Sequence, residues 1–193
     1  PYVLDWLIAL GRELDRRFMV RLVKGAYWDS EIKHAQEMGL PDYPVYTRKP
    51  TTDLSYQICA ERMMRARDAL YPQFATHNAY TVALILELAR NNQGDDDRDF
   101  EFQRLHGMGH LLYDQLRNMT SPPVNLRVYA PVGAHKDLLP YLVRRLLENG
   151  ANSSFVNRFM DKKVPVEELM QDCGDLVESA SPRRHGRIPL PVD

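Results

Sequence analysis

The polar residues that could do chemistry in this chain gather where short apolar runs end. The stretch 20–28 is a run able to form a strand that carries two cations, Arg21 and Lys24, and it leads to Gly25, Tyr27 and Trp28. Cations within an apolar strand are costly to bury unless a negative group meets them. A flat, electron-rich or phosphate-bearing ligand at the strand end would do so. An edge strand with both cations in solvent is the alternative.

The same arrangement recurs at the ends of three further predicted strands. The polar residues found there are Thr76, His77, Gln103, His106 and Tyr129. In a parallel α/β fold, the carboxyl ends of the strands form the rim where ligands bind. Each histidine taken alone is more typical of a satisfied structural group. Four consecutive strands that end in this way favour a shared site.

Two adjacent arginines, Arg144 and Arg145, lie near the end of the last strongly helical segment. They diverge by about 100° around a helix, so both reach one ligand only if it lies beside that helix. Complementing the helix dipole is the alternative role. Glu148 follows them in the weaker orientation for helix stability, but it could hold a guanidinium in one pose. Two guanidiniums so held would form a bidentate receptor for a carboxylate.

These residues need an alternating chain to bring them together. Apolar periodicity predicts helices near 2–16, 29–38, 53–67, 79–91, 109–118 and 136–149. It predicts strands near 18–24, 69–76, 100–105 and 126–130. Asp29 or Ser30 is the predicted cap of the second helix, 51–53 caps the third, and Gly150 ends the last.

Four successive strand–helix units predict an α/β fold with a parallel sheet. They suit the last four βα units of a (βα)8 TIM-type barrel, whose full length is typically about 250 residues. We therefore expect half a barrel at 1–160, followed by an irregular segment and a linker toward a further domain at 161–193. The abrupt start at Pro1 favours an origin in the middle of a longer protein.

Composition narrows the class of protein. The 193 residues are 44% hydrophobic and 26% charged, as in an ordinary globular protein. The formal net charge of -1 gives no electrostatic reason to expect nucleic acid. No apolar run has the length of a membrane span. Cys59 and Cys173 are far apart and lack metal-ligand spacing, so we expect a reduced intracellular pair and no metal site.

Six stretches carry a resemblance to a known family. They are RLVKGAYWD (21–29), YPVYTRK (43–49), PQFATHN (72–78), EFQRLHGMG (101–109), YAPVG (129–133) and LVRRLLENGANSSFVNR (142–158). Together they resemble the proline dehydrogenase domain, in the version found within the bifunctional proline utilization A flavoenzymes. The resemblance covers about residues 2–160, and the end of the chain resembles the connection toward an aldehyde dehydrogenase domain.

The resemblance implies an FAD-dependent barrel that oxidises L-proline to Δ1-pyrroline-5-carboxylate and passes electrons to a membrane quinone. Under it, Arg21, Tyr27 and Tyr129 are the catalytic residues, with Arg21 near the flavin N5/O4 edge. The cofactor-binding residues it implies are Arg21, Val23, Lys24, Gly25, Trp28, Thr47, Arg48, Lys49, Thr76, His77 and Gln103. The substrate-binding residues it implies are Leu22, Tyr27, Tyr129, Arg144, Arg145 and Glu148.

The resemblance also implies partners and a location. The partners are L-proline, a quinone, and the rest of the same polypeptide, including the first half of the barrel. The location is the cytoplasm, with peripheral association at the inner face of the bacterial plasma membrane left open. Because the first half of the barrel and its substrate-binding groups are absent, we expect that the chain alone neither folds stably nor holds FAD.

Two other functions remain as alternatives. A degenerate barrel could serve as a non-catalytic interaction or scaffolding module, with its rim residues kept for stability. Another barrel enzyme could act on a phosphorylated substrate, but it would want a Gly-rich loop after the last strands. Only Gly107, Gly109 and Gly133 are available there.

Overall fold

The computed structural model describes residues 1–25, 27–92, 99–150 and 172–192, with the backbone alone at 148–150. These residues divide into two compact units, and each is described by itself. Unit 1 comprises Pro1–Val23 and Tyr56–Val143, and unit 2 comprises Lys24–Ser55 and Arg144–Asp193.

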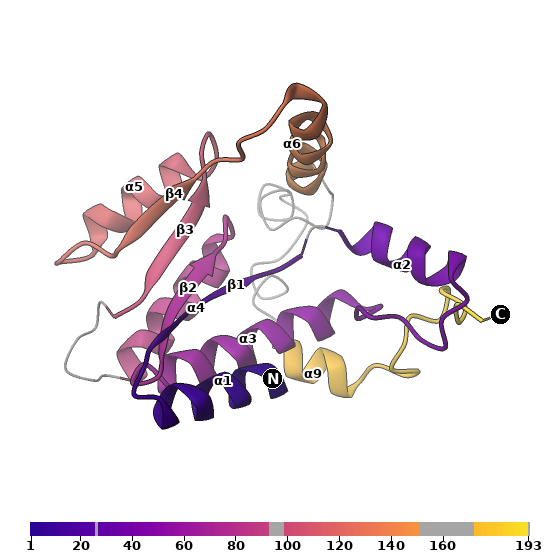
Figure 1. Cartoon of the computed structure of the whole chain (residues 1–193), viewed down its shortest axis with the longest axis horizontal. Coiled ribbons are helices and arrows are strands. Elements are labelled where there is room, and N and C mark those ends of the chain that lie inside the picture. Colours follow the sequence, from indigo (N-terminus) through magenta and orange to yellow (C-terminus); the bar gives the residue numbers. More distant parts are fainter. Residues whose placement is uncertain (26, 93–98, 151–171, 193) are drawn as a thin grey trace. The chain divides into compact units, whose positions relative to one another are not determined.

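Unit 1 contains a sheet of four parallel strands (Figure 1). The strands are β1 (Phe18–Val23), β2 (Leu70–Ala75), β3 (Glu101–Leu105) and β4 (Leu126–Tyr129), and they lie in the order β1-β2-β3-β4. Because every strand pairs in parallel with its neighbour, all four carboxyl ends lie at one edge of the sheet. Parallel order requires a crossover between strands, and the helices supply it.

Four helical segments of unit 1 pack against one face of the sheet. They are α1 (Tyr2–Glu13), the part of α3 (Lys49–Arg65) from Tyr56 onward, α4 (Ala79–Asn91) and α5 (His110–Met119). Their apolar side chains form one core with the strand residues that point toward them. At its centre Phe102 lies 5.6 Å from Phe100, 5.8 Å from Tyr113 and 6.4 Å from Phe74, measured between ring centroids.

The two faces of the sheet carry different chemistry because successive strand residues point to opposite sides. Phe18, Val20 and Leu22 of β1 pack on the core beside the helices. Met19, Arg21 and Val23 alternate with them and are exposed. The register aligns Arg21 with Gln73 and Gln73 with Glu101, so a polar row crosses three strands on the face away from the helices.

Unit 2 is built from shorter pieces. It contains α2 (Trp28–Glu37), the first part of α3, the end of α6 (His135–Gly150) from Arg144, and α9 (Cys173–Glu178). After α9, the described segment that ends at residue 192 hydrogen-bonds to residues of the loop before α3: Tyr43 donates to the Pro189 carbonyl, and Arg48 donates to the carbonyls of Pro182 and Arg184.

The predicted fold class is confirmed: the structure is a parallel α/β arrangement of strand–helix units. Helix 79–91 has the predicted bounds. The two predicted N-terminal helix caps were wrong, whereas α6, the last of the predicted helices, ends at Gly150 as predicted. The second helix begins at Trp28 after Tyr27, with no side-chain cap, and α3 begins at Lys49 rather than after 51–53. Pro50 explains the early start of α3, since a proline in the first helical turn lacks only an N–H that has no helical partner.

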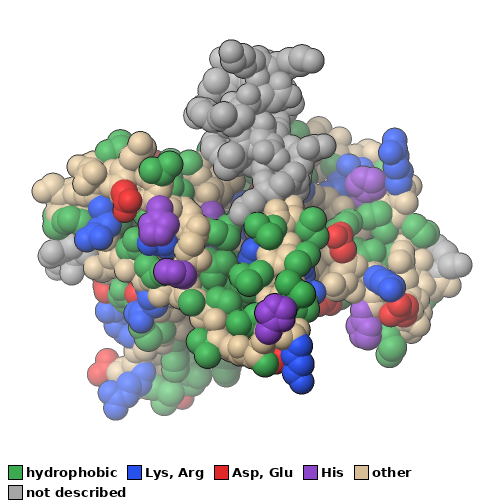
Figure 2. Space-filling view, turned by 90° about the horizontal axis from the view of Figure 1, so that it is seen from above, with side chains coloured by type: hydrophobic (Ala, Val, Ile, Leu, Met, Phe, Trp, Pro, Cys, Tyr) green, Lys and Arg blue, Asp and Glu red, His purple; other side chains and the backbone are tan. Residues whose placement is uncertain are grey.

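Two surface observations bear on partners. On the face seen in Figure 2, Lys and Arg side chains lie among acidic and hydrophobic ones rather than in one basic patch. Within the described part of the chain, no helix combines the length and the apolar character needed to cross a membrane.

The aromatic core predicts a large difference between two truncations. Phe102→Ala removes a side chain that is 0% exposed and surrounded by three other rings, which typically costs about 3–5 kcal/mol. Leu111→Ala, on the next helix at 80% exposure, should cost about 0.5 kcal/mol or less. Thermal unfolding of the full-length protein should therefore begin several degrees lower for Phe102→Ala alone. Equal curves for the two variants would contradict this core.

Candidate active site

Three of the predicted site residues of unit 1 come together on the polar face of the sheet. Arg21 Nε donates to Gln103 Oε1 at 2.9 Å. The Arg21 guanidinium also lies over the Tyr129 ring, 5.0 Å from its centroid. A guanidinium at that distance gains from the negative face of the ring. The structure thus joins β1, β3 and β4 through one cation.

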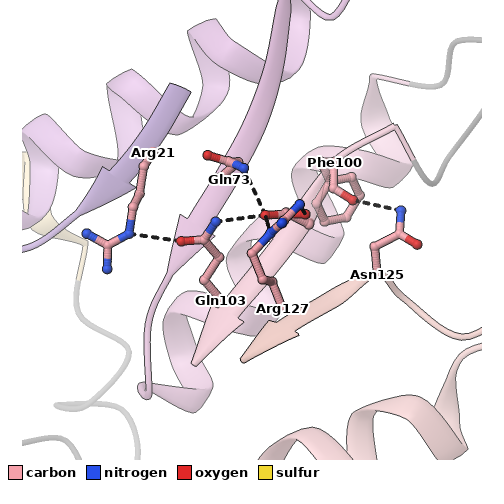
Figure 3. Close-up of polar contacts among 7 residues, drawn as sticks. Arg21, Gln73, Phe100, Gln103, Asn125 and Arg127 are labelled. Atoms are coloured by element: carbon pink, nitrogen blue, oxygen red, sulfur yellow. Dashed lines mark hydrogen bonds and ion pairs between the residues drawn. The ribbon is translucent and has the colours of Figure 1, made fainter. Parts of the chain in front are cut away.

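Behind this group lies a buried carboxylate that the sequence analysis missed. Glu101 is 5% exposed and accepts hydrogen bonds from Gln73 Nε2 at 2.9 Å and Gln103 Nε2 at 2.7 Å (Figure 3). Arg127 completes the set with Nε and Nη2 at 2.6 and 2.8 Å. Strand alternation could have found Glu101, because it stands two residues before Gln103 and therefore on the same face.

The protonation state of Glu101 follows from these contacts. Burial raises the pKa of its carboxyl, but the hydrogen bonds from Arg127 and the two glutamines, together with the Arg127 charge, outweigh burial and hold the pKa below its ordinary value. Glu101 is therefore an anion at neutral pH and can only accept hydrogen bonds.

The strand-end histidines differ in their surroundings. His77 Nε2 accepts from the Leu105 backbone N–H at 3.0 Å, so the neutral ring carries its proton on Nδ1. Thr76 Oγ1 accepts from Asn78 N at 3.1 Å, and the Thr76 carbonyl accepts from the Tyr113 hydroxyl at 2.8 Å. His106 is exposed beyond the end of β3. His77 and Thr76 thus have structural contacts, and their contact with a cofactor stays a prediction.

In unit 2, Lys24 and Lys49 share one carboxylate. Lys24 Nζ lies 2.5 Å from Asp53 Oδ1, and Lys49 Nζ lies 2.5 Å from Asp53 Oδ2. Burial raises the pKa of Asp53, and the charge and hydrogen bond of Lys24, followed by those of Lys49, outweigh it and lower the pKa. Two cations on one anion leave this cluster net positive, as a phosphate-bearing ligand would require.

Trp28, Thr47 and Arg48 lie around a cavity of about 1140 Å³ within unit 2. Trp28 Nε1 donates to the Tyr46 carbonyl at 2.8 Å, and Thr47 Oγ1 accepts from His185 N at 3.0 Å. Gly25 also lines this cavity, and a Cβ added there would meet no heavy atom within 4 Å. The cavity therefore gathers four of the residues predicted to bind the cofactor.

The two arginines of α6 pack on one aromatic ring. The guanidinium carbon of Arg144 lies 4.4 Å from the Tyr27 ring centroid, and that of Arg145 lies 5.8 Å from it. Arg144 Nε is buried and has no hydrogen-bond partner among the described residues. A buried donor without a partner costs about 1–3 kcal/mol, which an anionic ligand would relieve. The Glu148 side chain lies outside the described residues.

Not every predicted contact is brought together. Val23 is exposed on the same face as Arg21, whereas Leu22 packs on the hydrophobic core at the opposite face. Arg21 belongs to unit 1, and Arg144 and Arg145 belong to unit 2. That these three cations serve one ligand therefore stays a prediction.

A parallel α/β sheet with polar groups at its carboxyl edge is typical of α/β enzyme domains, and comparison with known proteins shows the family. The family model for proline dehydrogenase matches residues 1–158. The chain belongs to the proline dehydrogenase family.

Similar proteins agree with this family. "Bifunctional protein PutA" of Klebsiella aerogenes and of Escherichia coli are each 52% identical over the whole chain, which spans 15% of their length. "Proline dehydrogenase 1" of Bacillus subtilis is 31% identical over 75% of the chain and 41% of its own length. A crystal structure of a mutant of Bradyrhizobium japonicum proline utilization A matches 98% of the chain and 19% of its own, at 56% identity and a TM-score of 0.84.

The Asp53 ion pairs predict a pH-dependent contribution to stability. Because the pKa of Asp53 is lowered on folding, this contribution is fully present above the unfolded carboxyl pKa of about 4 and is lost as the pH falls through the lowered value. Asp53→Asn should therefore destabilise the full-length protein at neutral pH and make its thermal unfolding midpoint fall less steeply on acidification.

The control is Asp68→Asn, which removes a pair with Arg12 whose side chains are both more than half exposed. Exposed pairs contribute about 0–1 kcal/mol, so this variant should follow the wild-type curve closely. If the thermal unfolding midpoint falls equally with acidification in Asp53→Asn and wild type, the ion pairs of Asp53 with the two lysines do not stabilise the fold.

Proposed function

We propose that this chain forms the second half of the barrel of an FAD-dependent proline dehydrogenase. In the full-length protein the reaction is oxidation of L-proline to Δ1-pyrroline-5-carboxylate, with the electrons passed on to a quinone. The observation that carries the proposal is the packing of Arg144 and Arg145 on the Tyr27 ring, in a chain of the proline dehydrogenase family. It combines two cations for a carboxylate with a flat wall for a small ring.

The residues fit a large, anionic and aromatic cofactor. The cavity of about 1140 Å³ exceeds the usual range of about 300–1,000 Å³ for small-molecule sites. Thr47, Arg48 and the Lys24–Asp53–Lys49 cluster would hold the phosphate and adenosine end. FAD, when bound, supplies the hydride acceptor for the reaction.

On the polar face of the unit 1 sheet, Arg21 would provide positive charge where negative charge develops during the reaction, which is the most effective place for it. Gln103, Thr76 and His77 would contact the ring and ribityl portions of the cofactor, and Val23 and Trp28 would lie in its surroundings. The cofactor does the redox chemistry, and these side chains supply orientation and electrostatics.

The substrate would be oriented by charge at one end and shape at the other. Arg144 and Arg145 would pair with the proline carboxylate, and Glu148 would hold one guanidinium. Tyr27 and Tyr129 would wall the ring and exclude water, whereas Leu22, the third residue predicted to do so, packs on the core at the opposite face of the sheet. Holding the reacting carbon in near-attack geometry can supply a large share of the lowering of the activation barrier.

The proposal places the full-length protein in the cytoplasm, with quinone reduction at the inner face of the plasma membrane. The product can hydrolyse to an open-chain semialdehyde, the form that an aldehyde dehydrogenase uses. The word "bifunctional" in the names of the PutA relatives supports a second activity on the same polypeptide.

A non-catalytic scaffold is the competing function. The experiment that separates the two is addition of L-proline, without air, to the full-length protein while the visible flavin absorbance is followed. A dehydrogenase loses this absorbance as the flavin is reduced, whereas a scaffold shows no change. Absence of bound flavin, or of bleaching, would contradict the proposed function.

The carboxylate clamp predicts a selective kinetic defect. Arg145→Met keeps an apolar side chain over Tyr27 but removes a charged hydrogen-bond donor, a loss of about 1.5–3 kcal/mol. The KM for proline should rise about tenfold to a hundredfold, with FAD still bound. Arg12→Met, which breaks an exposed pair with Asp68, is the control and should leave the KM unchanged. An unchanged KM in Arg145→Met would remove the clamp assignment.

A further inference from the structure

We propose that Glu101 is a positioning residue: its carboxylate fixes the orientation of the Gln103 carboxamide, and Gln103 in turn fixes the Arg21 guanidinium. The inference rests on the proposed function, in which Arg21 lies beside the flavin. Glu101 lies outside the set of residues predicted to touch cofactor or substrate, and it acts through two of its neighbours.

The contacts form a continuous relay across the sheet. Glu101 Oε1 accepts from Gln103 Nε2 at 2.7 Å, and Gln103 Oε1 accepts from Arg21 Nε at 2.9 Å (Figure 3). Glu101 and Gln103 are each 5% exposed, so water has little access to these bonds. Arg21 is exposed on the polar face, and Gln103 and the Tyr129 ring are its partners there.

The direction of the relay follows from donors and acceptors. An ionised carboxylate only accepts hydrogen bonds, and a guanidinium only donates them. A carboxamide between the two must turn its NH2 group to Glu101 and its oxygen to Arg21. The lowered pKa of Glu101 keeps this constraint in force at neutral pH. Without the charge on Glu101, Gln103 could present either end, and the acceptor for Arg21 would no longer be assured.

Arg127 and Gln73 also hydrogen-bond to Glu101. Arg127 binds both carboxylate oxygens of Glu101, and its side chain is 54% exposed. Gln73 Nε2 donates to the same Oε1 atom as Gln103 does, at 2.9 Å. Gln73 and Gln103 therefore offer a matched pair: each donates one amide hydrogen bond to Glu101, and Gln103 alone of the two bonds to Arg21 in the described part of the chain.

The experiment compares Glu101→Gln, Gln103→Met and Gln73→Met in the full-length flavoprotein. Loosening Arg21 weakens charge stabilisation in the transition state, so Glu101→Gln and Gln103→Met should lower kcat for proline about tenfold. The KM should stay within about twofold of wild type, since uniform binding of the substrate is untouched. Gln73→Met should keep the kcat of the wild type.

The reduction potential of the bound flavin is the second measurement. It should shift in one direction if Glu101 positions Arg21 and in the other if Glu101 only forms an ion pair with Arg127. Removing a negative charge near the flavin directly would raise the potential, because the reduced flavin carries the extra negative charge. Loss of a fixed Arg21 lowers it. We expect a lower potential in Glu101→Gln and in Gln103→Met, and none of this shift in Gln73→Met.

Each outcome decides something. Suppose that proline reduces the wild type. If Glu101→Gln then has the same kcat as the wild type, or a flavin potential equal to or higher than that of the wild type, the positioning role fails while the proposed function stands. If Glu101→Gln does not fold, Gln103→Met decides: wild-type kcat and potential there overturn the relay. An equal loss of kcat in Gln103→Met and Gln73→Met would mean that any lost hydrogen bond to Glu101 has the same effect, and this would overturn the relay through Gln103. A wild type that proline does not reduce overturns the proposed function and this inference with it.

Discussion

The parallel order of β1 to β4 is the constraint on which the rest of unit 1 depends. It places all four carboxyl ends at one edge, and strand alternation then sends every second side chain to each face. One face meets the helices and is largely apolar, with Phe74 and Phe102 fully buried. The other face can therefore hold charge without disturbing the core, and Glu101 with its partners occupies it.

Each unit contains an ionised carboxylate with little exposure, and in each unit donors and cations surround it. In both cases the carboxylate lies among cations that were predicted to bind the cofactor: Glu101 bonds to Gln103, which bonds to Arg21, and Asp53 pairs directly with Lys24 and Lys49. Burial alone would favour the neutral acid at each position, but the adjoining donors and cations keep both carboxyls ionised. Neither carboxylate belongs to the predicted site, yet each bonds to residues that do.

The sequence predicted the elements better than their ends, and cations better than the anions that hold them. The spacing of the apolar residues identified each strand–helix unit, because the residues that a helix or strand buries recur with its own period in the sequence. The start of α3 was missed because the threonines and Asp53 have the composition of a cap, while Asp53 in fact serves two lysines. Glu101 escaped notice because its partners Gln73 and Arg127 are 28 and 26 residues away, and only the strand register brings them near.

The edges of the sheet bear on the strength of the relay. Among the described strands, β1 and β4 each pair on one side, and Met19, Val23 and Val128 are substantially exposed. In a closed barrel of this family, further strands would pair with both edges and enclose the polar face. Enclosure lowers the local dielectric, which strengthens each bond from Glu101 to Gln103 and from Gln103 to Arg21. In such a closed barrel, the proposed relay would therefore have its full effect on Arg21.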